Sequence, residues 1–427
     1  MKSLSIRLRA IAPLSIRSDH APDGAESAGY IPGTTFMGSL AAVHRRIYPE
    51  KKHEFERLFL RDKVLYPGLY PAIFKDKDKQ NREQQAIQDS NLPIYPVPKT
   101  AQSCKRYDGF RYPENDKNEA HGVRDSLLDW AIFKVSNSKT RAETGIKPLE
   151  ALREHKKCLC GEVMDHFTGY YRRQRTEPHN MFAAKTHTRL QTHTGIDRDS
   201  GIVQDGILYN RQVFEEDMRF WGTVKFLGDE EIISHFEAFI EEVGRSGLVR
   251  VGTGRTRGMG KVELSAEEEE QADRFGLFTK RLNALDALLH KRAEAFKVSG
   301  LDSTYFFALT LHSPLILCDD LLRYRSSIDA GILMEMLGCE VPGLQCIYQA
   351  ASVRRVSGWQ SLWGLPRMNE YAIETGSVFL FACASPPGEE VLRVLFDLEE
   401  RGAGKRRAEG FGRVCVSDQF HQEITLR

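Results

Sequence analysis

Apolar and polar residues alternate from Ser3 to Ile16, which is typical of a β-strand with one buried face. The segment YIPGTTFMGSLAAVHRRIY then turns at Pro32 and Gly33 and continues with apolar residues along one side. This pattern predicts a helix, and Thr34 or Thr35 is placed to cap its N-terminus.

A polar stretch follows the helix, and a regular pattern returns after it. Between about Glu50 and Phe182 the sequence is irregular and contains KDKDKQNREQQ, so we expect a large insert with solvated loops. Residues 185–214 predict a long β-hairpin with a tip rich in Gly and Asp. The strand MRFWGTVKF and the amphipathic helix DEEIISHFEAFIEEVGRSG complete the unit. This order of strands and helices is typical of a ferredoxin-like sandwich.

The same order returns in the second half of the chain. A charged helical link at residues 265–300 leads to the strand TYFFALTLHSPLIL, the helix SIDAGILMEMLG, further strands and the helix GEEVLRVLFDLEERG. The pattern therefore predicts an α+β protein with two ferredoxin-like (RRM-like) units in tandem, related by pattern rather than by residue identity. We expect the first unit at residues 1–264, with the irregular insert at about 50–182, and the second unit at residues 301–427.

A basic glycine loop ends each unit. The first is LVRVGTGRTRGMGKVEL at Leu248–Leu264, and the second is GAGKRRAEGFGRVCV at Gly402–Val416. Glycines let backbone N–H groups approach an anion closely, and arginines add charge-assisted contacts to phosphate. The two loops together predict a ligand with a phosphate backbone. Tight hairpins with solvated arginines are the alternative.

Two nucleotide-binding classes are excluded by the surroundings of these loops. Val262 stands where the Mg²⁺-binding Ser or Thr of a P-loop should be, and a strand rather than a helix follows. A dinucleotide fold needs the order strand, glycine turn and helix, which the chain does not contain.

Composition limits where anion binding can come from. The chain has 427 residues, of which 41% are hydrophobic and 28% charged, and its net charge is +1. Such a length suggests two or three domains, and such a charge gives no attraction of the whole molecule to nucleic acid or to a membrane. The eight cysteines are too sparse for a disulfide scaffold, no run of about 18 apolar residues occurs, and the first residues do not resemble a signal peptide. We therefore expect a cytoplasmic protein without a membrane partner.

The cysteines fall into two groups. Cys104, Cys158 and Cys160 lie in the polar insert with His121, and three thiols and one imidazole would complete a tetrahedral structural zinc site. The spacing departs from the usual CxxC because only Leu159 separates the pair, and His155 and His166 are rival fourth ligands. The remaining cysteines lie in or beside apolar segments and are expected to be small buried hydrophobes: Cys318, Cys339, Cys346, Cys383 and Cys415.

The quoted segments resemble a known family. YIPGTTFMGSLAAVHRR together with the GxGRxRGxGxV-type loop is similar to the RAMP superfamily of CRISPR-associated proteins. GWQSLWGLPRMNEYAIETGSVFLF followed by GAGKRRAEGFGRV resembles the tandem-ferredoxin RAMP subunits of type III effector complexes. The insert, with AHGVRDSLLDWAIF and CLCGEVMDHFTGYY, looks most like the large group-five RAMP protein of type III-D systems.

This resemblance implies a non-catalytic subunit that grips the repeat-derived 5′ tag of the guide RNA (crRNA) and caps one end of the backbone filament. The implied partners are the guide RNA, other RAMP backbone subunits and the polymerase-like large subunit, with target RNA contacted indirectly. The backbone amides at the start of the first helix form a natural phosphate seat, for which an ordinary helix cap is the alternative. The candidate RNA-binding residues are therefore Gly33, Thr34, Thr35, Arg250, Gly252, Gly254, Arg255, Arg257, Gly258, Gly260, Lys261, Gly404, Lys405, Arg406, Arg407, Gly410, Gly412 and Arg413.

Three alternatives stay open. A metal-independent ribonuclease that processes guide RNA would use His20 or His44 as its general acid or base. Metal-assisted cleavage of target RNA would use Asp19 or Asp23. A zinc-containing nucleic-acid-binding module outside CRISPR would explain the insert but not the two loops.

Overall fold

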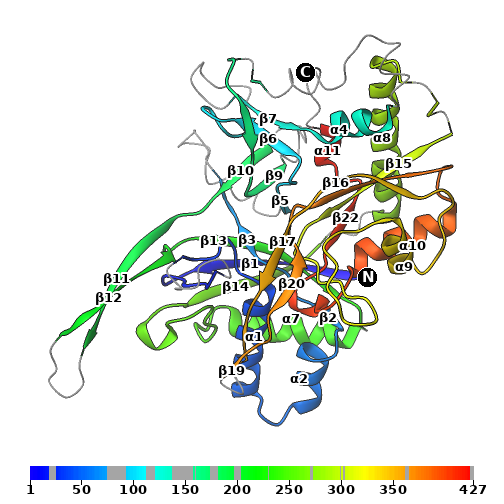
Figure 1. The fold of residues 1–427 in the computed structure, drawn as a ribbon. Helices are drawn as coiled ribbons and strands as arrows, with labels where there is room; N and C mark the ends of the chain where they lie inside the picture. Colours follow the sequence, from blue (N-terminus) through cyan, green and yellow to red (C-terminus); the bar gives the residue numbers. More distant parts are fainter. Residues whose placement is uncertain are drawn as a thin grey trace, which may run out of the picture.

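The computed structural model of the protein describes residues 1–18, 26–74, 93–111, 121–136, 157–158, 160–173, 181–196, 203–228, 230–269, 273–298, 300–301, 303–360 and 365–423. Helices are combined with several antiparallel sheets (Figure 1), which confirms the mixed α and β class. Within these ranges, no helix has both the length and the apolar character that crossing a bilayer requires. Some residues discussed above lie outside the described ranges, namely Asp19, His20, Asp23, His155, Leu159 and the hairpin tip at 197–202.

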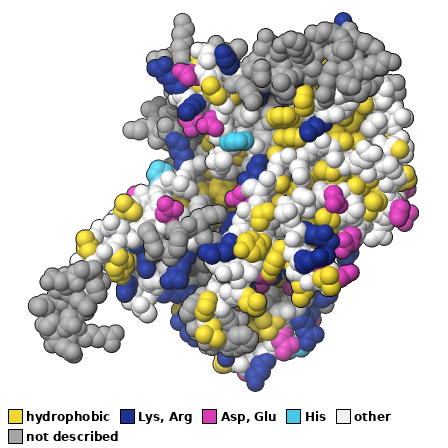
Figure 2. All heavy atoms as spheres, in the orientation of Figure 1, with side chains coloured by type: hydrophobic (Ala, Val, Ile, Leu, Met, Phe, Trp, Pro, Cys, Tyr) yellow, Lys and Arg dark blue, Asp and Glu magenta, His cyan; other side chains and the backbone are white. Residues whose placement is uncertain are grey.

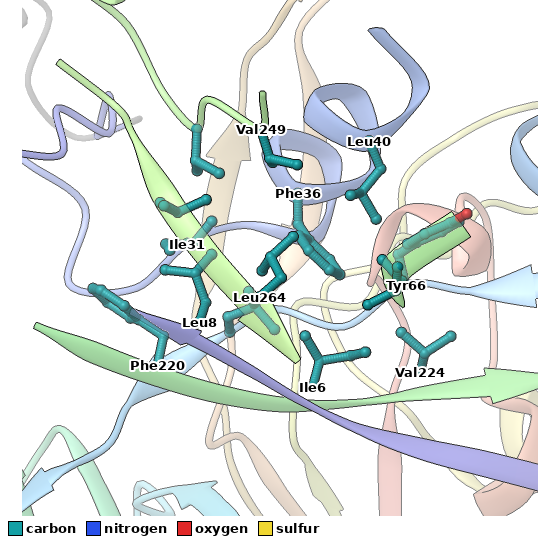
Figure 3. Packing of buried hydrophobic residues seen from close by; sticks show 14 of the residues in the cluster. Ile6, Leu8, Ile31, Phe36, Leu40, Tyr66, Phe220, Val224, Val249 and Leu264 are labelled. Carbon is teal, nitrogen blue, oxygen red and sulfur yellow. The ribbon is translucent and has the colours of Figure 1, made fainter. Parts of the chain in front are cut away.

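The first half is built on a sheet in which β1 (Lys2–Ala10) is central. The other strands are antiparallel to their neighbours, in the order β14-β1-β13-β2, with β3 also paired to β13: β13 (Arg219–Phe226), β14 (Val262–Glu268), β2 (Val64–Leu65) and β3 (Tyr70–Pro71). Three helices pack on this sheet, α1 (Gly33–Ile47), α2 (Lys52–Phe59) and α7 (Glu230–Gly244). The alternation in β1 directs Ile6 and Leu8 into the core with Phe36 and Leu40 of α1 (Figure 3).

The second half is built on a sheet in which β15 (Tyr305–Leu311) is buried along its whole length. Its neighbours are ordered β16-β21-β15-β22, with β16 (Gln345–Ala350), β21 (Val378–Cys383) and β22 (Val414–Val416). One face of β15, with Phe307 and Leu309, packs in a core with α9 (Ala330–Leu337) and α10 (Glu389–Arg401). The other face, with Phe306, packs on α8 (Arg274–Ala295) and α4 (Leu127–Val135). Because helices cover both faces, the strand contains no polar alternation.

The two sheets repeat one arrangement. In chain order, the first half runs β1, α1, β2, β13, α7, β14, and the second runs β15, α9, β16, β21, α10, β22. In each sheet the fourth of these strands lies beside the first, followed by the third and then the second. The two halves therefore share one strand order.

The stretch at 50–182, predicted to be irregular, contains more regular structure than its sequence pattern indicates. α2, β2 and β3 lie at its start; β2 and β3 are strands of the first sheet, and α2 packs on that sheet. Two further small sheets, ordered β4-β10-β9-β5 and β7-β6-β8, follow: β4 (Ile73–Phe74), β5 (Ile94–Pro96), β6 (Ala101–Cys104), β7 (Val123–Asp125), β8 (Met164–His166), β9 (Tyr170–Arg173) and β10 (Met181–Lys185). Strands of two to five residues are too short to show a clear alternation, which is why the pattern missed them.

Each half carries a β-ribbon between its second and third sheet strands. The predicted hairpin is present as β11 (Thr188–Ile196) and β12 (Val203–Phe214), and it projects from the body of the protein (Figure 1). The second ribbon consists of β17 (Val353–Val356) and β20 (Glu370–Ile373), with β18 (Trp359–Gln360) and β19 (Leu365–Pro366) beyond them. The chain's described part ends in the short helix α11 (Phe420–Glu423).

Candidate functional site

The two glycine loops have the same backbone shape. Each contains one turn of 3₁₀ helix, η2 (Arg255–Arg257) in the first and η3 (Arg407–Glu409) in the second. A left-handed residue lies on either side of each turn, with φ of 75° at Gly254 and 80° at Gly258, and 59° at Arg406 and 91° at Gly410. Glycine is favoured at such positions because it has no Cβ. Arg406 adopts this conformation despite its side chain.

Each loop is anchored to the segment that follows the first strand of its sheet. In the first half, the N–H of Thr253 donates to the carbonyl oxygen of Ser15 (2.8 Å), and the N–H of Gly260 donates to that of Pro13 (2.9 Å). In the second half, the N–H of Lys405 donates to Ile316 (2.9 Å), and that of Gly412 donates to Pro314 (2.8 Å). The same two contacts therefore fix both loops.

Several loop glycines are needed for this anchoring. A Cβ at Gly252 would lie 2.4 Å from the carbonyl oxygen of Ser15, and one at Gly404 would lie 2.3 Å from that of Ile316. Gly260 and Gly412 approach the opposite side of their own loops just as closely. Gly258 differs, because it is exposed and a Cβ there would meet nothing within 4 Å. Close packing of backbone thus explains four of the candidate glycines without any ligand.

The first loop presents its charges at the base of the β11–β12 hairpin. Arg255, Arg257 and Lys261 are exposed, and the Arg257 guanidinium donates to the hydroxyl of Tyr209 on β12. Figure 2 shows dark blue side chains gathered beside the base of this hairpin. Arg250 is half-buried and donates to the carbonyl oxygen of Met259 (3.3 Å), so it braces the loop from within.

The second loop uses two of its arginines inside the protein. Arg406 forms ion pairs with Glu370 and with Glu409, and its charge lowers the pKa of Glu409 against the opposing effect of burial. Arg413 is half-buried and donates to the carbonyl oxygens of Thr223 (2.7 Å) and Leu65 (3.2 Å), both in the first half of the chain. Lys405 is exposed, and Arg407 is half-buried.

The start of α1 lies against the second loop. Pro32 occupies the N-cap position and no side chain caps the helix, so the prediction that Thr34 or Thr35 is the cap is wrong. The N-cap lies two residues before Thr34, the earlier of the two predicted caps, because Pro32 already has the fixed φ, here −59°, that precedes a first turn. Gly33 is buried, and Thr34 and Thr35 are half-buried beside it. The structure thus joins two segments that the sequence placed at opposite ends of the chain.

The four predicted metal ligands lie together at one end of the β7-β6-β8 sheet. Cys104 ends β6, His121 precedes β7, and Cys158 and Cys160 precede β8. One ligand atom from each of the four lies within 4.8 Å of every other. Sγ of Cys104 is 3.7 Å from Sγ of Cys160, and Nδ1 of His121 is 3.2 Å from Sγ of Cys158. His166, the rival ligand within the described residues, is exposed on β8 and is not part of the cluster.

The pKa values of two thiols in the cluster shift in opposite directions, and only the shift of Cys104 favours the thiolate that binds a metal. Burial alone would raise the pKa of Cys104, but N–H groups of Tyr107 and Arg106 and the neighbouring Cys160 thiol lower it overall. Burial raises the pKa of Cys158 to about 11, and the other two thiols contribute to the rise. Three crowded thiols without a cation resist ionisation together, whereas a divalent cation at their centre would remove that penalty. The remaining cysteines are buried or half-buried, as expected for small hydrophobes.

His44, the described candidate for acid–base catalysis, lies in the core. Its side chain is 0% exposed, its Nε2 lies 2.9 Å from Oε1 of Glu54, and the rings of Phe59 and Phe239 pack against it. In this position it contacts no solvent, so an RNA phosphate cannot reach it.

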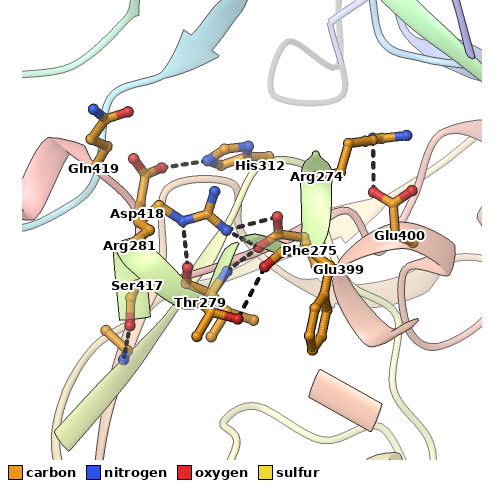
Figure 4. Close-up of polar contacts among 12 residues, drawn as sticks. Arg274, Phe275, Thr279, Arg281, His312, Glu399, Glu400, Ser417, Asp418 and Gln419 are labelled. Carbon is orange, nitrogen blue, oxygen red and sulfur yellow. Dashed lines mark hydrogen bonds and ion pairs between the residues drawn. The ribbon is translucent and has the colours of Figure 1, made fainter. Parts of the chain in front are cut away.

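A buried polar network between the halves and the insert was not predicted from the sequence. Asp418 lies 2.6 Å from Nε2 of His312 and 3.0 Å from Arg173, and both partners lower the pKa of Asp418 against its burial. Arg281 pairs with Glu399 in the same region (Figure 4). The residues come from distant segments, so no local sequence signal could have identified them.

A cavity of about 230 Å³ adjoins this network. Three of its cationic lining residues, Lys225, Arg274 and Arg281, form ion pairs with Glu399 or Glu400. Arg407 and Arg413 also line the cavity, and neither forms an ion pair within the described residues. Because Arg413 reaches carbonyl oxygens of the first half, the cavity lies at the joint between the halves.

Two sheets with the same strand order, each carrying a β-ribbon and an anchored basic glycine loop, define a mixed α/β protein. A family profile described as the RAMP superfamily matches residues 7–263, and the chain belongs to this superfamily.

Comparison with solved structures gave distant neighbours. A chain of the cryo-EM structure of the type III-B Cmr-beta complex bound to cognate target RNA and AMPPnP is 10% identical, with a TM-score of 0.34, and the match covers 88% of this chain and 86% of that one. A chain of the apo type III-B Cmr-beta structure is 11% identical, with a TM-score of 0.30 and coverage of 62% and 96%. A chain of a type IV-B CRISPR complex is 10% identical, with a TM-score of 0.26 and coverage of 63% and 92%. No curated protein sequence matches the chain.

Proposed function

We propose that this chain is an RNA-binding subunit of a type III CRISPR effector complex, and that it grips the repeat-derived 5′ tag of the guide RNA and caps one end of the backbone. The observation that carries the proposal is the pair of glycine loops, which have one backbone shape, one anchoring scheme and exposed cations. Membership of the RAMP superfamily supports it. The group-five subunit of type III-D systems, which the sequence resembles, would perform this task.

The two halves are, in this proposal, ferredoxin-like units in tandem. Their common strand order supports this assignment, because a ferredoxin-like sheet places its fourth strand beside its first and its third beside its second. The proposed units are residues 1–264 and 301–427; the first boundary falls within β14, the second unit begins shortly before β15, and α8 lies in the link.

Direct phosphate contacts are assigned to exposed loop residues, namely Arg255, Arg257, Gly258, Lys261 and Lys405. Thr34, Thr35 and Arg407 are half-buried at the edge of the same surfaces and would contribute their polar atoms. Arg250, Arg406 and Arg413 support the loops through their intramolecular contacts. This division follows the general rule that phosphate contacts position a protein on RNA, while packed groups hold the contacting surface in shape.

Zinc is the metal that the cysteine and histidine cluster fits. Two sulfur ligands about 2.3 Å from a tetrahedral Zn²⁺ lie about 3.8 Å apart, close to the 3.7 Å between Cys104 and Cys160. A bound Zn²⁺ would supply structural cross-linking rather than chemistry, because all four positions are protein ligands. Cys104, His121, Cys158 and Cys160 would then tie the ends of three short strands together.

A non-catalytic role is part of the proposal. The buried position of His44 supports it, since general acid–base catalysis requires access to the substrate. A RAMP-fold ribonuclease remains the second candidate, and cleavage of repeat RNA by the purified chain would favour it. Other backbone subunits and the polymerase-like large subunit are the proposed protein partners, with target RNA contacted indirectly.

The test is RNA binding by the full chain with Arg255→Glu and Arg257→Glu combined. We expect affinity for guide RNA to fall at least tenfold. The slope of log affinity against log salt concentration should become less steep by the equivalent of about two phosphate contacts. The matched control is Lys280→Glu with Lys291→Glu on the exposed side of α8, which makes the same charge change away from the loops. Unchanged affinity in the loop variant, or an equal loss in the control, would overturn the proposal.

A further inference from the structure

Two exposed tyrosines of the second half form a ring pair at the surface. Tyr324 and Tyr371 are 39% and 48% exposed, their ring centroids are 5.8 Å apart, and the rings meet edge to face at 70°. Tyrosines with this much exposed ring surface retain a free face for another flat group.

The turn that carries Tyr324 is preorganised. Asp319 accepts from the N–H groups of Leu321 (3.0 Å) and Arg323 (2.8 Å), and Cys318 pairs with Tyr324 across the turn. Leu322 is held at a φ of 60°, a conformation that a branched side chain adopts only when its surroundings impose it. Tyr324 is therefore presented by a fixed turn.

The tyrosine pair adjoins the second glycine loop. The segment after β15 pairs with Lys405 of the loop through Ile316 and with Ile373, the last residue of β20, through Leu315. Tyr371 is two residues before Ile373 on the same strand. Burial and the charge of Glu370 raise the pKa of Tyr324, while Lys405 and Arg406 oppose the rise, so Tyr324 lies within electrostatic reach of the loop.

The charge around the two rings is positive. Arg355 lies directly across the ribbon from Tyr371 and is exposed, and within the described residues neither Arg355 nor Lys405 forms an ion pair. Two nearby acids have partners, since Glu370 pairs with Arg406 and Asp319 pairs with Arg323, whereas Asp320 in the turn is exposed and forms no ion pair within the described residues. The ribbon faces the viewer in Figure 1, and Figure 2 shows apolar and basic side chains side by side on this face.

The first half has a corresponding arrangement. Its ribbon ends at Phe214, which pairs with Leu14 as Ile373 pairs with Leu315. On that ribbon Tyr209 stacks on His193 (5.2 Å) and accepts from Arg257 of the first loop. Both halves thus place an aromatic pair from the ribbon region beside a basic glycine loop.

We propose that Tyr324 and Tyr371 form a stacking platform for an unpaired base of single-stranded RNA, whose phosphates are held by Lys405 and Arg355. The inference rests on the proposed function and adds to it a base-contacting surface on the second half. Single-stranded RNA is held by such combinations of aromatic faces and cations, and stacking tolerates any base because every base has a π-face. The platform therefore adds affinity without reading sequence.

The experiment uses the full chain and a short oligoadenylate that carries 2-aminopurine, an adenine analogue whose fluorescence falls when it stacks. We expect quenching on binding to the parent, and for Tyr324→Ala with Tyr371→Ala we expect no quenching and about tenfold weaker binding. Tyr324→Phe with Tyr371→Phe should keep both, because the rings remain. An oligonucleotide with abasic sugars should bind the parent and the double alanine variant equally.

The possible negative results of this experiment distinguish the stacking platform from the proposed function. If the double alanine variant quenches and binds as the parent does, the platform is refuted while the glycine-loop proposal stands. If the parent binds no RNA, the proposed function and this inference both fail. If the alanine variant binds RNA normally but loses assembly with partner subunits, as Leu321→Ala with Leu322→Ala then should too, the surface docks protein and the inference is overturned.

Discussion

Gly33 at the start of α1 lies directly against Glu409 of the second glycine loop. A Cβ at Gly33 would be 2.5 Å from the carbonyl oxygen of Glu409 and 3.0 Å from Cα of Gly410. The N–H of Tyr66, in the first half, also donates to the carbonyl oxygen of Ala408 in that loop (3.0 Å). The second loop is consequently a joint between the halves, in addition to its proposed contact with RNA.

Gly33→Ala is therefore expected to destabilise the protein. The backbone of the loop cannot move by itself, because Gly410 also packs closely against Tyr66 and Gly68. We expect a loss of about 1–3 kcal/mol, measured as the free energy of unfolding in denaturant. Gly38→Ala on the same helix is the control, since Gly38 is exposed and a Cβ there meets nothing within 4 Å. That change should stabilise by about 0.5–1 kcal/mol, and a similar effect of both changes would contradict the close packing at Gly33.

Zinc content gives the second prediction. Elemental analysis of the purified chain should find about one zinc per molecule, and Cys104→Ser should abolish it. Chelation should expose the insert to protease while the two sheets stay resistant, because metal binding and local folding are coupled. Cys339→Ser, a half-buried cysteine outside the cluster, should leave the zinc content unchanged. A chain without zinc that keeps its resistance would exclude a structural metal.

Much of this cluster and of the loops could be predicted because the signals are local in sequence. Cys158 and Cys160 are nearly adjacent, and the glycine spacing of each loop appears in one short stretch. The engagement of Arg413 with Thr223 and Leu65 could not be predicted, because no sequence rule pairs a loop arginine with carbonyls in another unit. The longer strands could be predicted from alternating or continuous apolar residues, whereas the short strands of the insert carry too few residues to show either pattern.

We expect the folding stability to depend on pH because of His421, a buried histidine near the C-terminal end of the described chain. Nε2 of His421 is hydrogen-bonded to the hydroxyl of Thr310 (2.9 Å), and Nδ1 of His421 lies 2.7 Å from Oδ2 of Asp125. Burial alone would lower the pKa of His421, but the charge and hydrogen bond of Asp125 and the charge of Asp418 raise it above 6.5.

Since the folded pKa is the higher one, the stabilisation is fully present below pH 6.5 and is lost as the pH rises through the folded value. We expect the thermal midpoint of the parent to fall more steeply than that of His421→Gln between about pH 6 and about pH 9. Asp125→Asn should flatten the profile in the same way, because it removes the charge that raises the pKa. Parallel profiles for all three proteins would show that the pair does not titrate in this range.

Neighbouring residues of the second loop should respond oppositely to substitution. Lys405 is exposed, and no ion pair involves it within the described residues, whereas Arg406 pairs with Glu370 and Glu409 and its side chain is 16% exposed. Lys405→Ala should weaken RNA binding several-fold with little effect on unfolding, because it removes a phosphate contact but no packing. Arg406→Ala should cost roughly 3 kcal/mol, since it leaves the largely buried Glu370 without a cation and Glu409 with Arg367 alone.

Stability measurements can show whether Arg406→Ala destabilises the protein through its unpaired acidic partners or through general damage to the loop. Adding Glu370→Gln and Glu409→Gln to Arg406→Ala should restore most of the lost free energy of unfolding, because the uncompensated charges are then gone. RNA affinity of the restored triple variant, measured well below its unfolding temperature, should stay closer to that of the parent than the affinity of Lys405→Ala does. Arg406→Ala could instead weaken RNA binding more than Lys405→Ala while leaving stability intact. Arg406 would then leave its acidic partners to contact RNA, and the assignment of RNA contact to Lys405 and of a structural role to Arg406 would be wrong.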